Sequence, residues 1–87
     1  MMATDDERHR ALHTLAAALR GQGYHVTVHR WHLVAESSEG RSAEVWVQGR
    51  PCDNGRLWFT GPGGMPLCEA EQTANAVAAV KGALCRE

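Results

Sequence analysis

The sequence has few of the features that reveal an activity directly. It contains three cysteines, Cys52, Cys68 and Cys85, an odd number that is too small for a disulfide framework. Its charge is nearly balanced, with nine basic and ten acidic residues and a formal net charge of −1. Proteins that bind duplex DNA carry a clear basic excess, so we expect no duplex DNA partner.

Long apolar segments are also missing from the chain. No apolar run approaches the roughly 18 residues of a membrane-spanning helix, so we expect no membrane association of that kind. The first residues, MMATDDERHR, are acidic and polar and lack the basic-then-apolar pattern of a signal peptide. We therefore expect a cytoplasmic location, where cysteines stay reduced.

The length of 87 residues indicates one domain, residues 1–87. A domain of this size buries only roughly 60–65% of the surface of its unfolded chain, so its stability margin is small. Dimerisation is a common way to add stability to such a domain, and we expect a homodimer.

A helix is expected over residues 4–23. Thr4 and Glu7 have the spacing of a capping box, in which side chains bond the free amides of the first turn. Gly21 or Gly23 supplies the left-handed residue that ends a helix. The apolar stripe of this helix consists of Leu12, Leu15, Ala16 and Leu19.

Strand patterns occupy residues 24–60. Residues 24–28 and 31–35 alternate in opposite phases, which predicts a tight turn or bulge around His29 to His32 between two strands. Residues 42–50 read as a third strand and residues 57–60 as a fourth, joined through an Asn54-Gly55 turn. The inward side chains expected for these last two strands are Ala43, Val45, Val47, Leu57 and Phe59.

A second, alanine-rich helix is expected from about Cys68 to Leu84, with Glu69 and Glu71 near its start, where the helix dipole favours negative charge. The order of elements predicts an α+β domain of two layers. It consists of a helix, an antiparallel sheet of three or four strands and a second helix, with both helices on one face.

The segment FTGPGGMPLCEAE, residues 59–71, raises the question of a phosphate site. Three glycines, Gly61, Gly63 and Gly64, lie between an expected strand and an expected helix. The segment has no lysine, its prolines remove amide donors, and its glutamates would repel phosphate. We therefore interpret it as a corner between strand and helix, in which Gly63 or Gly64 adopts positive φ.

The sheet face opposite the helices carries the candidate site. If the aliphatic residues face the helices, two tryptophans on adjacent strands lie on the other face among polar side chains, a composition typical of interaction surfaces. In the simpler alternative, Trp46 and Trp58 only pair across the strands, which contributes about 0.2–1 kcal/mol. The predicted interaction face consists of Trp46, Trp58, Arg56, His25, His29, Trp31, Glu44 and Gln48, with Trp31 depending on how the phase break resolves.

No catalytic or metal-binding set is recognisable. His9 and His13 share a helix face, but a third metal ligand is missing. His25 and His29 are four residues apart on a strand, roughly 13 Å and too far for one ion. Cys68 has neighbouring glutamates and no histidine placed as its base, so we expect a packed, inert thiol. We expect neither a metal nor another cofactor, and no enzymatic activity.

Three segments resemble a family: ALRGQGYHV, LWFTGPGGMPL and ANAVAAVKGAL. They are similar to a group of small, mostly uncharacterised actinobacterial α+β proteins that are often encoded beside helix-turn-helix regulators. Tyr24 stands where that group has tryptophan, and the fourth strand has fewer aromatic residues. The resemblance implies a regulatory or accessory role and no catalytic residue. A fainter similarity is to secretion-chaperone-like domains, which dimerise and bind partner proteins.

The sequence thus predicts a non-enzymatic interaction module that binds itself or a partner protein through its tryptophan-bearing sheet face. The alternative is a binder of single-stranded nucleic acid or of a planar small molecule, since such ligands stack on aromatic side chains of sheets.

Overall fold

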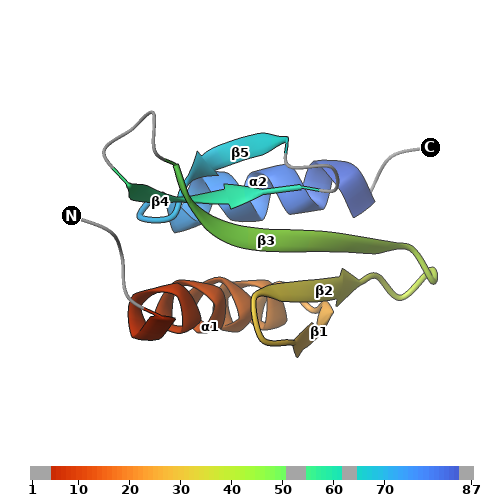
Figure 1. Cartoon of the computed structure of the whole chain (residues 1–87). Coiled ribbons are helices and arrows are strands. Elements are labelled where there is room, and N and C mark those ends of the chain that lie inside the picture. Colours follow the sequence, from red (N-terminus) through yellow and green to blue (C-terminus); the bar gives the residue numbers. More distant parts are fainter. Residues whose placement is uncertain (1–4, 51–54, 62–64, 85–87) are drawn as a thin grey trace.

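The computed structural model describes residues 5–50, 55–61 and 65–84 of the chain. Within these residues the chain forms two helices and one five-stranded antiparallel sheet, an α+β fold as predicted (Figure 1). The elements follow in the order α1 (Asp5–Gly21), β1 (His25–Val28), β2 (His32–Glu36), β3 (Ser42–Arg50), β4 (Arg56–Thr60), β5 (Pro66–Glu69) and α2 (Thr73–Leu84).

The sheet is a meander in which each strand pairs with its neighbour in sequence, in the spatial order β1-β2-β3-β4-β5. The long strand β3 joins the two halves. Its first residues pair with β2 and its last residues pair with β4, and both pairings include Trp46. The expected turn at His29 is present as well, because β1 ends at Val28 and the amide of His29 donates to the carbonyl of His32 at 2.7 Å.

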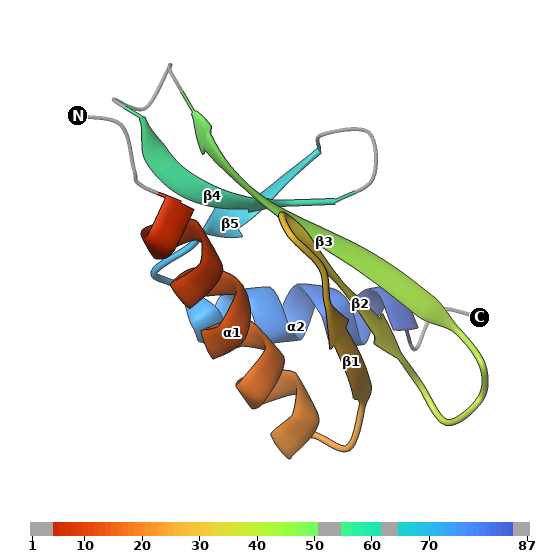
Figure 2. The ribbon, with the colours of Figure 1, turned by 60° about the horizontal axis from the view of Figure 1, so that its bottom comes forward.

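The helices cover different parts of this sheet. α1 contacts β1, β2 and β3, whereas α2 contacts β3 and β5, and the two helices also contact each other (Figure 2). The expected arrangement therefore needs correction, because a fifth strand exists and each helix packs mainly on its own half of the sheet. The cause is the twist of the meander, which turns β4 and β5 away from the direction of β1 and β2.

One hydrophobic core joins the helices and the sheet. The expected stripe of α1 is fully buried, and the inward alternation predicted for β3 and β4 holds at Val45, Val47 and Phe59. The register carries this inward set across the sheet, because Leu33 pairs with Val45, and Phe59 pairs with both Val47 and Cys68. The core consists of Leu12, Leu15, Ala16, Leu19, Leu33, Ala35, Val45, Val47, Phe59, Cys68, Ala76, Val80 and Leu84.

The second helix begins later than the sequence predicts. Residues 66–69 form β5, in which Cys68 pairs with Phe59 and Glu69 pairs with Trp58, and α2 begins only at Thr73. Pairing with β4 holds residues 66–69 in an extended conformation, so they cannot belong to a helix. A turn follows β5, with the Gln72 amide donating to the Glu69 carbonyl at 3.0 Å.

The glycine-rich segment consequently connects two strands, not a strand and a helix. Its first glycine, Gly61, donates its amide to the carbonyl of Met65 at 2.7 Å and so closes the connection between β4 and β5. The expected positive φ at Gly63 or Gly64 lies outside the described residues, as do the Thr4 cap and Asn54.

Candidate protein-binding face

The outer face of the sheet is the side that alternates with the core residues. In β3, Glu44, Trp46 and Gln48 alternate with the buried Val45 and Val47. Residues directly opposite each other in antiparallel strands share a face, so the register extends this set across the sheet. The outer face consists of His25, Thr27, His32, Val34, Glu36, Ser42, Glu44, Trp46, Gln48, Arg56, Trp58, Thr60 and Glu69.

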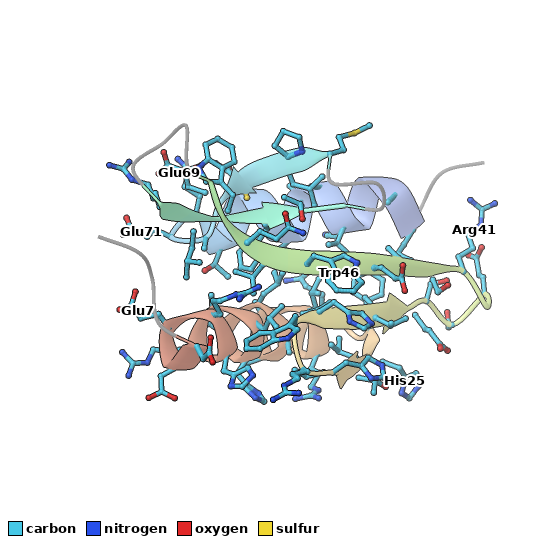
Figure 3. The ribbon with its side chains drawn as sticks, in the orientation of Figure 1. Glu7, His25, Arg41, Trp46, Glu69 and Glu71 are labelled. Atoms are coloured by element: carbon cyan, nitrogen blue, oxygen red, sulfur yellow. The ribbon has the colours of Figure 1, made fainter. Side chains whose placement is uncertain are left out.

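Both expected tryptophans belong to this face. Trp46 lies directly opposite Thr60, and Trp58 lies opposite Gln48, so the two indoles are diagonal neighbours on adjacent strands. Each is half-buried. Figure 3 shows the side chain of Trp46 in front of β3. The two tryptophans therefore project away from the core.

Trp46 is the end of a stack of three aromatic rings. The ring of His32 lies 4.2 Å from that of Trp46, with 19° between the ring planes, and the ring of His29 lies 4.6 Å from that of His32, with 16° between the planes. The stack crosses from the β1–β2 turn to β3. It holds three side chains in one defined arrangement, so they lose little rotational freedom when a partner binds.

Trp31 is not part of this stack. Its ring faces the start of α1, where the ring of His9 stacks on it at 5.2 Å and the guanidinium carbon of Arg8 lies 4.2 Å from its centroid. Arg8 also donates to the carbonyl of Val47 at 3.1 Å, and His9 Nε2 lies 2.9 Å from the carbonyl oxygen of Arg30. Trp31 thus packs the β1–β2 turn against α1. This contact answers the question, left open by the phase break, of whether Trp31 lies on the interaction face.

The charged residues of the expected face lie around the tryptophans. Arg56 donates to Glu69 across β4 and β5 at 3.3 Å, with 54% of the Arg56 side chain and 27% of the Glu69 side chain exposed. At the other end of the sheet, His25 lies opposite Glu36, and Glu44 lies opposite Val34. The face therefore has an aromatic centre with charged residues toward both of its ends.

Two features of this face were missed in the sequence. His32 was placed only in the turn, although an inward Leu33 already requires an outward His32 by simple alternation. Thr60 belongs to the outer face by its pairing with Trp46, but it is only 2% exposed, and among the described residues its Oγ1 has no hydrogen-bond partner. Nothing in the sequence distinguishes a buried from an exposed threonine at this position.

The groups considered for chemistry have other surroundings. Cys68 lies in β5 and not at a helix start, and it is buried. Burial raises the pKa of its thiol, and the negative charge of Glu69 raises it further. Among residues 5–50, 55–61 and 65–84, no three histidine, cysteine, aspartate or glutamate side chains lie close enough to hold a metal ion.

No family model, no curated protein and no solved structure matches this chain. Among the helices of the described residues, none is both long and apolar enough to cross a membrane.

Proposed function

We propose that this protein is a small non-enzymatic interaction module that binds a second copy of itself through the outer face. The observation that carries the proposal is the position of Trp46 and Trp58, two half-buried indoles that project from adjacent strands away from the core. Interface centres are enriched in tryptophan, and contiguous patches of this composition are rare on surfaces that bind nothing.

Two further properties of the face support this role. The His29–His32–Trp46 stack is already ordered, which lowers the entropic cost of binding. The domain is small, so covering the indoles by a second copy adds to a stability that its own core limits.

The test is the effect of removing both indoles. We expect the native protein to sediment as a dimer at micromolar concentration and the Trp46→Ser, Trp58→Ser double variant to sediment as a folded monomer. Truncation of a central interface residue costs about 2 kcal/mol or more, so each substitution should weaken association about 30-fold or more.

Trp31→Ser is the matched control, because it removes the same side chain from the contact with α1 and not from the outer face. It should lower the melting temperature while the protein, below that temperature, still dimerises. A native protein that stays monomeric at high concentration would rule out self-association through this face.

A second candidate function rests on the ring stack itself. Three stacked rings, two on the sheet and one in the β1–β2 turn, resemble the platforms on which nucleobases and planar small molecules stack. The net charge of −1 counts against single-stranded nucleic acid, whose backbone requires basic side chains. Titration with a short oligothymidylate, followed by quenching of tryptophan fluorescence, distinguishes the two: binding that Trp46→Ser abolishes would favour this function.

The proposed cellular role rests on the resemblance to the actinobacterial proteins, which implies a regulatory or accessory role. In that role the module would act through its oligomeric state.

A further inference from the structure

We infer that the second copy binds face to face, related by a two-fold axis at Trp46, so that Glu36 of each copy lies against Arg56 of the other. The inference rests on the proposed self-association and assigns its geometry. It follows from where the register places these two charges relative to Trp46.

Glu36 and Arg56 occupy equivalent positions on opposite sides of Trp46. Glu36 of β2 lies opposite Ser42, four residues before Trp46 along β3. Arg56 of β4 lies opposite Arg50, four residues after Trp46. Each charge is therefore roughly 13 Å from Trp46 along the strands and about 4.8 Å to one side, and the two sides are opposite. They are diagonal corners of the outer face.

A two-fold axis that lies in the interface and passes through Trp46 exchanges these two corners. A self-contacting interface must place each residue against its counterpart in the same way in both directions. Here the rotation places the carboxylate of Glu36 against the guanidinium of the partner's Arg56, and the same contact forms a second time with the roles of the two copies reversed. The strand directions of the two sheets then cross at roughly 40°, close to the about 30° at which aligned sheets pack. Charge and packing thus favour the same orientation.

The chemistry of the two corners permits the contact. Glu36 is exposed, and Arg56 remains 54% exposed on its side chain while it donates to Glu69. A guanidinium has five N–H donors, so it can bind a second carboxylate. The same rotation brings Glu44 toward the amide N–H donors of the partner's Gln48. The acidic end of one copy therefore lies on donor groups of the other.

The experiment uses two charge reversals, Glu36→Arg and Arg56→Glu, each in the full chain. Alone, each variant converts both ion pairs of the dimer into like-charge contacts, and its dissociation constant should rise about tenfold or more in low salt. Mixed in equal amounts, the two variants form a heterodimer in which both contacts are attractive again. Sedimentation of the mixture should return the dissociation constant to within about threefold of the native value.

Glu71→Arg is the control for a general charge effect, because this exposed residue lies between β5 and α2, outside the outer face. It should associate like the native protein. Recovery on mixing also shows that the variants are folded.

The outcomes separate this inference from the proposed function. If the native dimer depends on Trp46 and Trp58 but Glu36→Arg and Arg56→Glu associate normally, or weaken without recovery on mixing, the orientation is overturned and the self-association stands. If the native protein does not dimerise, both fall.

Discussion

Thr60 provides the sharpest test of how the sheet is stabilised. Thr60 is 2% exposed and lies between Trp46 and Pro66 in the strand pairing, and its Oγ1 has no hydrogen-bond partner among the residues that the structure describes. A buried hydroxyl without a partner has lost its bonds to water and gained nothing in return. Thr60→Val replaces this hydroxyl by a methyl group of similar size, so we expect a more stable protein.

The size of the gain can be estimated from the structure. Leaving a buried polar group unsatisfied costs about 1–3 kcal/mol. Exchanging it for a methyl group recovers that cost, and burial of the added apolar surface contributes up to about 0.8 kcal/mol more. We therefore expect the free energy of unfolding to rise by about 1–4 kcal/mol. Each kcal/mol should raise the melting temperature by about 4–8 °C in a domain of this size.

Urea denaturation followed by circular dichroism measures this change. Thr27→Val is the matched control, because it makes the same substitution at an exposed position of β1 and should change stability by less than about 0.5 kcal/mol. If Thr60→Val is instead less stable than native by more than this control, the hydroxyl has a partner, such as a bound water, and the reasoning is refuted.

Three further predictions concern stability and reactivity. Gly23 has φ of 93°, so Gly23→Ala should lower the free energy of unfolding by about 1 kcal/mol. Gly82 lies inside α2 with open space around an added methyl group, so Gly82→Ala should raise the free energy of unfolding by about 0.5–1 kcal/mol. Urea denaturation of both variants measures these two changes and their signs. Burial raises the pKa of the Cys68 thiol, and the negative charge of Glu69 raises it further. In a variant without the other two cysteines, the rate of Cys68 alkylation should therefore reach half its maximum at a higher pH in the folded protein than in the urea-unfolded protein. Equal pH profiles would contradict this assignment. Trp31→Ala should lower the free energy of unfolding by about 2 kcal/mol, because the indole is half-buried against α1. An unchanged melting temperature in this variant would show that the β1–β2 turn does not depend on the indole.

The parts of the fold that short-range pattern determines could be predicted from the sequence. The bounds of β3, residues 42–50, agree with the expected strand, because its alternation runs unbroken between two turns. The phase break at His29 correctly separated β1 from β2, since one face of each strand must meet the same core. The same alternation placed Trp46 and Trp58 on the outer face.

The parts that depend on a distant partner could not be predicted. Strand β5 has only four residues, and Glu69 resembles the acidic first turn of a helix; only its pairing with β4 makes it a strand. The contact of Trp31 with His9 joins positions far apart in sequence, and the stack of His32 on Trp46 depends on the register of β2 against β3, which places these two residues opposite each other. Periodicity contains none of this information.

The meander has a consequence for the order in which the protein folds. All four strand pairings join sequence neighbours, so each can form as a hairpin with little loss of chain entropy, and such local contacts favour rapid folding. The contact of α1 with α2 is the long-range step, marked by Lys81 Nζ donating to Gln22 Oε1 at 3.3 Å across 59 residues. Until α2 has been synthesised, the core residues of β3 and β5 that it contacts have no cover. A growing chain therefore exposes a half-formed core until α2 leaves the ribosome.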